Sequence, residues 1–150
     1  MIVTNLNLRG FLSLNNGEIA SELLLSKSNE FPRINEKLDG KPYHYLYLAG
    51  FNGVANDKKE MLDGEGLYKI NVTTKEILEW SEKGCSSGEP VFVSTPGALE
   101  EDDGVVLALI LDHIHDDSFL LILDGKSFKE LGRARAPHLI PEGFHGQYFN

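Results

Sequence analysis

The sequence has a single cysteine, Cys85, among 150 residues, which excludes a disulfide within the chain. A chain without disulfides suits a reducing compartment, and we find no basic segment followed by an apolar block near Met1. We therefore expect a cytoplasmic protein. Apolar runs are also short, and none approaches the ~18 residues that a membrane-spanning helix needs. The sequence predicts no transmembrane span.

Basic residues are scarce as well. Fourteen Lys and Arg are outnumbered by 23 Asp and Glu, which gives a formal net charge of −9. A surface of this sign repels phosphate backbones, so we expect no nucleic-acid partner.

Long helical patterns are missing, and short strands separated by turns take their place. Residues 43–48 (YHYLYL) alternate tyrosines with other side chains at a period of two, which is typical of a strand. Fifteen glycines and six prolines supply turns. The sequence therefore predicts an all-β fold. The expected strands are residues 18–26, 43–49, 66–72, 76–81, 90–94, 105–112, 119–124, 130–136 and 144–149.

Two segments of the chain follow the same plan of strand, Asn or Asp, polar turn and second strand. Asn71 and Asp124 occupy the same place in each unit, 53 residues apart (124 − 71), whereas the Lys-Glu pairs that begin at Lys75 and Lys129 give 54 (129 − 75). Their side chains can accept hydrogen bonds from the turn that follows. About four strands in each ~40–50 residues is typical of propeller blades. A sandwich with two similar hairpins is the alternative.

A second spacing links three candidate functional residues. Glu30, Glu89 and His145 lie 59 (89 − 30) and 56 (145 − 89) residues apart, close to the blade period. Equivalent positions in successive blades surround one axis, so these side chains could converge. Two carboxylates and an imidazole suit a metal ligand with outer hydrogen-bond acceptors. An ordinary turn is the alternative for Glu89, because it precedes a proline.

Short motifs occur along the chain in an order that resembles a known family. They are residues 30–35 (EFPRIN), 66–69 (GLYK), 88–93 (GEPVFV), 96–98 (PGA), 101–105 (EDDGV), 120–124 (LLILD) and 143–146 (GFHG). The chain resembles the C-terminal part of the carotenoid cleavage oxygenases, which include β-carotene oxygenases and the retinal pigment epithelium retinoid isomerase. The resemblance covers residues 28–150, which we expect to form C-terminal propeller blades. Residues 1–27 match less well and are expected to be a separate β segment.

The resemblance implies a seven-bladed propeller with Fe2+ on its axis, held by four histidines and surrounded by three glutamates that accept hydrogen bonds from them. By this resemblance His145 is the last iron-binding histidine, and Glu30 and Glu89 are two of the glutamates. The implied reaction is cleavage of a conjugated C=C bond of a carotenoid or apocarotenoid by O2 to two carbonyl products. A retinoid isomerase is the alternative within the family.

The rest of the family's iron site does not match this sequence. In the family the other three histidines precede the EFPRIN motif, but the 29 residues before Glu30 contain no histidine. One imidazole falls far short of a ligand set, so we expect the isolated chain not to hold iron tightly and to be inactive. It is then either a fragment of an oxygenase or a truncated remnant that could act as an interaction module.

Other polar residues have more ordinary interpretations. We expect His113 and His115 to lie in a polar hairpin loop rather than in a metal site, and residues 100–103 (EEDD) to form a solvated turn. His44 is expected to pack within its sheet. Cys85 lacks the strongly basic surroundings of a reactive thiol.

Overall fold

The structure is a computed structural model that describes residues 8–12, 19–51, 66–141 and 143–149. Within them the only helix is a short 3-10 turn, so the all-β prediction is confirmed. The elements are β1 (Leu8–Leu12), β2 (Ile19–Leu23), β3 (Asn29–Arg33), η1 (Glu36–Leu38), β4 (Tyr45–Gly50), β5 (Leu67–Asn71), β6 (Ile77–Trp80), β7 (Cys85–Ser87), β8 (Val91–Ser94), β9 (Gly104–Asp112), β10 (Asp117–Asp124) and β11 (Glu130–Arg135).

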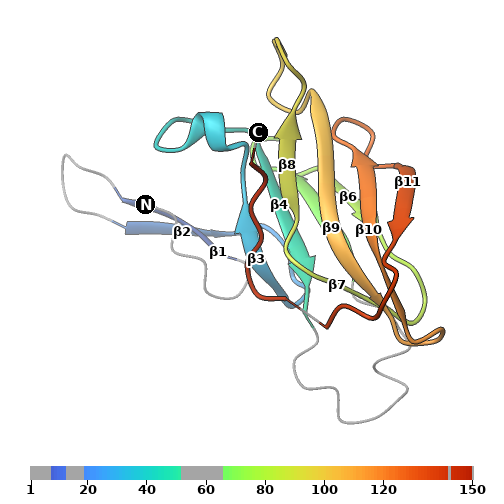
Figure 1. Cartoon of the computed structure of the whole chain (residues 1–150). Helices are drawn as coiled ribbons and strands as arrows, with labels where there is room; N and C mark the ends of the chain where they lie inside the picture. The colour runs from blue at the N-terminus through green and yellow to red at the C-terminus, as the bar shows by residue number, and fades with distance from the viewer. Residues whose placement is uncertain (1–7, 13–18, 52–65, 142, 150) are drawn as a thin grey trace.

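Most strands belong to two antiparallel sheets that follow one another along the chain (Figure 1). The first sheet has the order β3-β4-β5-β6, and β1 and β2 form a separate hairpin before it. The second sheet has the order β11-β10-β9-β7, and β8 also pairs with β9. Strands β7 and β8 share one edge of β9, opposite residues 110–112 and 104–107 respectively. Two successive sheets of this form are the repeat that the sequence predicted.

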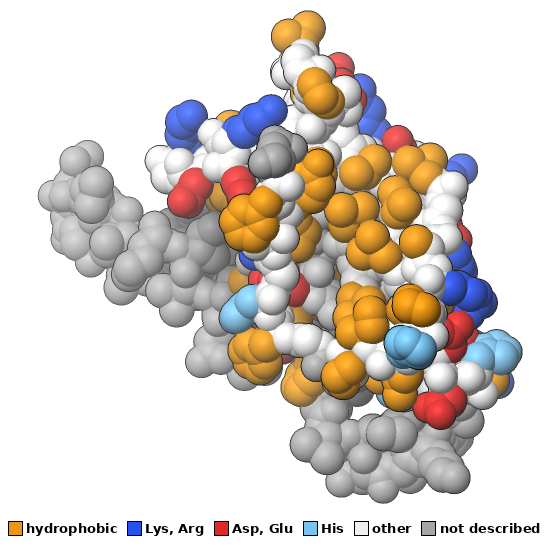
Figure 2. All heavy atoms as spheres, in the orientation of Figure 1, with side chains coloured by type: hydrophobic (Ala, Val, Ile, Leu, Met, Phe, Trp, Pro, Cys, Tyr) orange, Lys and Arg blue, Asp and Glu red, His pale blue; other side chains and the backbone are white. Residues whose placement is uncertain are grey.

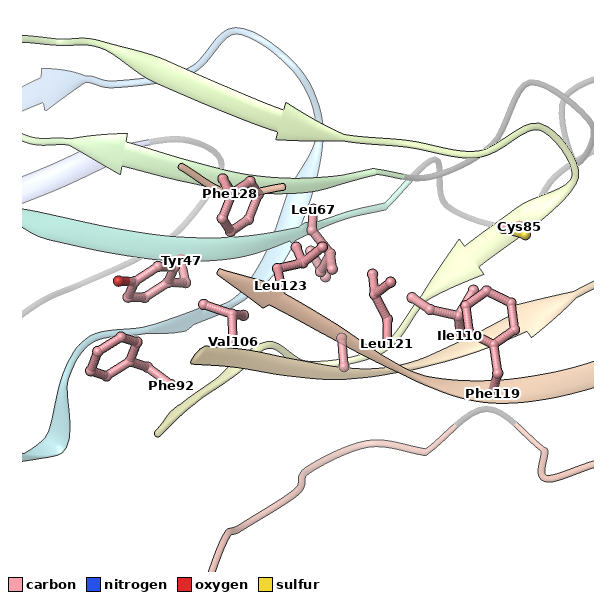
Figure 3. Close-up of a cluster of buried hydrophobic side chains, with 12 residues drawn as sticks. Tyr47, Leu67, Cys85, Phe92, Val106, Ile110, Phe119, Leu121, Leu123 and Phe128 are labelled. Atoms are coloured by element: carbon pink, nitrogen blue, oxygen red, sulfur yellow. The ribbon is translucent and has the colours of Figure 1, made fainter. Parts of the chain in front are cut away.

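The two sheets pack face to face around an apolar core (Figure 3). Alternate residues of β9, Val106, Ala108 and Ile110, are almost fully buried and point into it, as a strand with one covered face requires. Tyr47 and Leu67 reach the same core from the first sheet. Burial of this apolar surface is the main favourable contribution to folding.

The opposite face of the first sheet is buried as well. Leu46 and Leu48 of β4 and Ile70 of β5 pack there with Leu25 and Tyr43. The first sheet is therefore a middle layer covered on both sides, which explains why β4 is buried along nearly its whole length. Among the described residues, the outer face of the second sheet is covered only in part, by residues 143–149.

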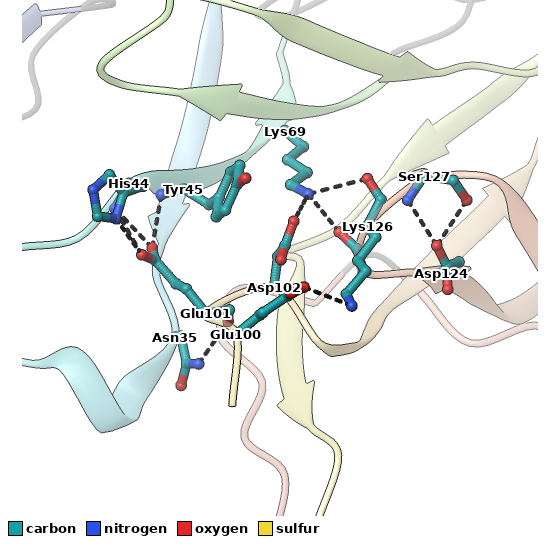
Figure 4. Close-up of polar contacts among 11 residues, drawn as sticks. Asn35, His44, Tyr45, Lys69, Glu100, Glu101, Asp102, Asp124, Lys126 and Ser127 are labelled. Atoms are coloured by element: carbon teal, nitrogen blue, oxygen red, sulfur yellow. Dashed lines mark hydrogen bonds and ion pairs between the residues drawn. The ribbon is translucent and has the colours of Figure 1, made fainter. Parts of the chain in front are cut away.

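A polar junction also joins the two sheets (Figure 4). Lys69, whose side chain is 3% exposed, donates from Nζ to Asp102 Oδ2 at 2.7 Å and to the Gly125 carbonyl oxygen at 2.7 Å. Glu101 accepts hydrogen bonds from the backbone N–H groups of His44 and Tyr45. The expected turn before β9 is present at residues 100–103, but its expected full solvation is wrong, because Glu101 and Asp102 are hydrogen-bonded to residues of the first sheet.

The prediction for His44 is also wrong. Its side chain is 64% exposed, and Nδ1 lies 2.9 Å from Glu101 Oε2. The residue precedes β4, which begins at Tyr45, so its imidazole is not held within the sheet.

The two predicted hairpins form, and their turns share the same contacts. Asn71 Oδ1 accepts the N–H groups of Thr73 and Thr74, and Asp124 Oδ1 accepts the N–H of Ser127. Lys75 and Phe128 close the turns with φ of 66° and 58°, and each donates its N–H to the carbonyl oxygen four residues earlier. The repeat is therefore 53 residues long. The spacing of 54, obtained by matching Lys75 with Lys129, is wrong by one residue.

Three strands were missed and one was predicted wrongly. The missed strands are β1, β3 and β7; β3 contains Pro32, which normally argues against a strand, and β7 has only three residues. Residues 143–149 contain no strand, although 144–149 was expected to be one. Side chains rather than a ladder hold this segment beside β3 and β8 (Figure 1).

Candidate functional site

The site begins at the break between β7 and β8, where Glu89 leaves the sheet. Pro90 follows it and has no N–H to give to a ladder, so the strand is interrupted here. The Glu89 side chain is 5% exposed. Its Oε2 accepts the N–H of Gly146 at 2.7 Å, and its Oε1 lies 3.2 Å from His145 Nδ1. Residues 56 positions apart are thus brought together by one buried carboxylate.

His145 lies on the C-terminal segment, residues 143–149, which passes across β3 and β8. Its side chain is 67% exposed. With Nδ1 facing Glu89, the other ring nitrogen, Nε2, is the one placed to meet a metal, and the carboxylate would fix the tautomer. The Phe144 ring packs edge-on against the imidazole with centroids 5.0 Å apart.

Strand β3 contacts this segment through an irregularity. Its pairing with β4 shifts between Glu30 and Arg33, and Phe31 has φ of 54°, an unusual conformation for a bulky residue. The shift turns the Phe31 ring toward the C-terminal segment, where it packs edge-on against Phe144 at 5.4 Å and against His145 at 5.7 Å.

Arg33 completes the contact from the end of β3. Its Nη1 lies 3.3 Å from Glu89 Oε1 and 3.3 Å from the Gly146 carbonyl oxygen. Its Nη2 donates to Glu36 Oε1 at 2.6 Å and approaches Gln147 Oε1 at 3.3 Å. Sequence reasoning missed this residue, and the only available signal was its place inside the EFPRIN motif.

Glu30, the third residue predicted for the site, is not part of this hydrogen-bonded cluster. It lies on β3 opposite Ala49 and is exposed to solvent. Among the described residues the side-chain partners of Glu89 are His145 and Arg33, so the structure brings two of the three predicted residues into contact, and Glu30 is not among these partners.

A groove of about 250 Å3 opens next to Glu89 and His145. It runs between the C-terminal segment and the outer face of β9 and β10, and its walls are mainly apolar. Lining residues include Val91, Leu107, Leu109, Leu120, Phe144 and Tyr148.

The donor atoms present fit one position of a metal site. His145 offers one imidazole nitrogen, and Glu89 offers an acceptor for the other. Within the part of the chain that the structure describes, no group of three or more His, Cys, Asp or Glu side chains could hold a metal ion. The remaining ligands of any such site must come from outside these residues.

The other candidate groups take no part in this arrangement. His113 and His115 lie in the β9–β10 hairpin as expected, where Asp112 Oδ2 lies 2.6 Å from His115 Nδ1. Cys85 is buried, and burial raises the pKa of its thiol to about 11, so it is protonated at neutral pH. Among the described residues, no helix is long and apolar enough to cross a bilayer.

Comparisons with known proteins agree on one family. The family described as "Retinal pigment epithelial membrane protein" matches residues 7–150. A mitochondrial carotenoid-cleaving dioxygenase of Pongo abelii is 42% identical over 121 residues, covering 79% of this chain and 20% of that protein. The β,β-carotene 15,15'-dioxygenase of Gallus gallus is 40% identical over 126 residues, covering 83% of this chain and 23% of that protein.

Solved structures give the same result for the fold. A chimera of ACO, an apocarotenoid oxygenase, and RPE65 is 28% identical with a TM-score of 0.78, covering 95% of this chain and 31% of that one. A cobalt-substituted Synechocystis ACO is 25% identical with a TM-score of 0.80, covering 96% and 31%. These similarities confirm propeller blades rather than a free-standing sandwich.

The match concerns one part of the family's architecture. The chain spans about a fifth of the length of the curated relatives it matches. Both the ordered motifs and the two tandem sheets lie within the matched region. The chain belongs to the carotenoid cleavage oxygenase family, as an all-β, partial propeller.

Proposed function

We propose that this chain is part of an iron(II)-dependent carotenoid or apocarotenoid cleavage dioxygenase, which splits a conjugated C=C bond with O2 into two carbonyl products. The contact between Glu89 and His145 carries the proposal. An imidazole whose Nδ1 is held by a buried carboxylate has a fixed tautomer and a more basic Nε2, as a metal-ligating histidine needs. Relatives at 40–42% identity are named as carotenoid dioxygenases, which supports the substrate class.

The residues have distinct parts in this proposal. His145 is the iron ligand through Nε2, and Glu89 is the acceptor that orients its ring. Glu30 is assigned to a second ligand imidazole, which this chain does not itself supply. Iron(II), when bound by imidazoles with open coordination positions, supplies the means of reacting with O2. The mainly apolar groove beside His145 offers an apolar surface, which suits a carotenoid or apocarotenoid substrate.

A non-enzymatic alternative also has an observation in its favour. No described cluster has three metal-ligating side chains, and the relatives are about five times longer than the match. The chain would then be an inactive propeller remnant or an interaction module.

A retinoid isomerase is the other alternative within the family, given the description of the matched family. The cytoplasmic location, the lack of a nucleic-acid partner and the boundary between residues 27 and 28 stay predictions; the Pongo abelii relative is named mitochondrial.

A graft tests the proposal directly. Residues 28–150 replace the matching segment of the Gallus gallus dioxygenase, and iron content and carbonyl products from β-carotene are measured. We expect the graft to hold iron and to cleave β-carotene. His145→Ala should remove most of the iron, and Glu89→Ala should lower iron occupancy or turnover roughly 10–100-fold, the usual effect of losing such an acceptor.

His138→Ala is the matched control, because this histidine lies in the described chain outside the contacts of Glu89. Retention of full iron and turnover by the His145→Ala graft would refute the assignment. If the 150-residue chain alone bound stoichiometric iron and cleaved an alkene, the alternative of an inactive propeller remnant would be excluded.

A further inference from the structure

We infer that Arg33 is a positioning residue that clamps the C-terminal segment and thereby fixes His145 against Glu89. The iron-ligand role of His145 comes from the proposed function, but the clamp itself rests on contacts between described residues. Arg33 is the side chain that reaches both the buried carboxylate and the backbone next to the imidazole.

The geometry of the guanidinium supports this role. One terminal nitrogen faces Glu89 and the Gly146 carbonyl oxygen, and the other faces Glu36 and Gln147. Gln147 Nε2 also donates to Glu36, at 3.0 Å to each oxygen. A planar fork of fixed donors sets the relative positions of several acceptors, whereas the donors of a lysine ammonium lie on one nitrogen and rotate.

Burial and charge point the same way. The Arg33 side chain is 19% exposed and lies between the carboxylates of Glu89 and Glu36, which are 5% and 54% exposed. Without the arginine, the partners of the buried Glu89 carboxylate among the described residues would be the Gly146 N–H and the imidazole. Loss of a charged partner from a buried carboxylate is costly, so the segment would move to let water reach it.

The need for a clamp follows from the lack of a ladder. Residues 143–149 form no strand, so backbone hydrogen bonding to a neighbouring strand does not fix their place. The irregularity in β3 brings Phe31 and Arg33 to the segment together, and Phe31 keeps a strained φ of 54° in doing so. Strain of this kind persists only where the surrounding contacts maintain it.

The test measures amide hydrogen exchange at Gly146, whose N–H donates to Glu89, in the 150-residue chain. Arg33→Met keeps the length of the side chain but removes the fork. We expect exchange at Gly146 to rise about tenfold or more, while the buried amide of Leu121 in β10 keeps its protection. Gln147→Ala should give a smaller rise, because it removes one arm of the clamp. Arg135→Met is the matched control, since Arg135 pairs with Asp117 away from the site.

Two results would overturn the inference. One is Gly146 exchange in Arg33→Met that stays within about twofold of the parent, and the other is an equal rise at Gly146 and Leu121, which would make Arg33 a general stabilising residue.

A cobalt(II) titration separates this inference from the proposed function. Paramagnetic broadening of the His145 ring signals should require several-fold more Co2+ in Arg33→Met than in the parent. If Co2+ broadens His145 in neither protein while the exchange result holds, the clamp stands without any metal, and the iron content of the His145→Ala graft alone decides the ligand role of His145. If both proteins respond to the same Co2+ concentration, Arg33 does not position the imidazole.

Discussion

Lys69 is the clearest case of a single side chain with a large structural role. Its ammonium is buried between the sheets, where it binds Asp102 and the Gly125 carbonyl oxygen and lies 4.1 Å from the centroid of the Tyr45 ring. A buried charge is tolerated only when its partners satisfy it, so removing either member of the pair is costly.

Lys69→Met should lower the free energy of unfolding by about 3–5 kcal/mol, because it leaves Asp102 buried without its partner. Urea denaturation of the two proteins measures the difference. The double variant Lys69→Met, Asp102→Asn removes both charges and should recover part of the loss. A loss below about 1 kcal/mol in the single variant would show that the pair behaves like an exposed one.

Asp124 gives a pH-dependent contribution. The backbone N–H and hydroxyl of Ser127 hold the pKa of Asp124 below its ordinary value of 3.8. Because the pKa is lower in the folded state, the stabilisation is fully present above 3.8 and is lost as the pH falls through the folded pKa.

Asp124→Ala should therefore cost about 1 kcal/mol at neutral pH, and the gap from the parent should shrink below pH 3.8. Thermal unfolding as a function of pH measures it. Asp124→Asn is the control, since it keeps an acceptor oxygen without a titrating group, so its gap from Asp124→Ala should not change with pH.

Among the elements, the two repeated hairpins were readable from the sequence and β3 was not. The turns at Asn71 and Asp124 are predictable from local sequence, because each side-chain oxygen accepts a hydrogen bond from a backbone N–H two or three residues ahead. Strand β3 forms because it pairs with β4, a contact that the local sequence does not reveal. Its Pro32 argues locally against a strand.

The start of β9 is an element-scale test of close packing. A Cβ added at Gly104 would lie 2.2 Å from the Val93 carbonyl oxygen and 2.8 Å from the Phe92 ring. Gly104→Ala must therefore separate β8 from β9, and we expect a loss of about 2 kcal/mol or more in urea denaturation.

Gly132 on β11 provides the matched control, because nothing lies within 4 Å of its added Cβ. Gly132→Ala should be neutral or slightly stabilising through the unfolded chain. Equal effects at the two glycines would contradict the packing argument.

For the whole molecule, the main asymmetry is between the two sheets. The first is buried on both faces, whereas apolar side chains of β8, β9 and β10 gather on the outer face of the second (Figure 2). Large exposed apolar patches promote association in solution. We therefore expect the isolated chain to self-associate as its concentration rises.

Leu120→Lys should weaken that association. Leu120 is 38% exposed and lines the groove on this face. Loss of a leucine's burial, about 1.5–3 kcal/mol, corresponds to at least about a tenfold higher concentration for half-association in sedimentation experiments. Leu99→Lys is the control, since Leu99 is 98% exposed on a loop before β9. If both variants associate like the parent, the outer face is not responsible.

The candidate site, like strand β3, was predictable only in part, because contacts between distant parts of the chain determine it. Spacing along the chain related Glu89 to His145, and the structure places them in contact. The same spacing grouped Glu30 with them, but Glu30, which lies opposite Ala49, is not among the described side-chain partners of Glu89. Blade periodicity predicts which strand a residue belongs to. The irregularity in β3, which brings Phe31 and Arg33 to the C-terminal segment, could not be predicted from that spacing.

The break between β7 and β8 has a consequence for how this family can change. Residues 85–87 and 91–94 each pair with β9 independently, so one residue inserted next to Glu89 would leave the paired residues of both strands unchanged. It would nevertheless move the carboxylate by about 3.4 Å, the rise of one strand residue. Strand pairing therefore does not fix the position of this carboxylate. Its contacts with Arg33, His145 and Gly146 do, and they give this loop a reason to keep a constant length.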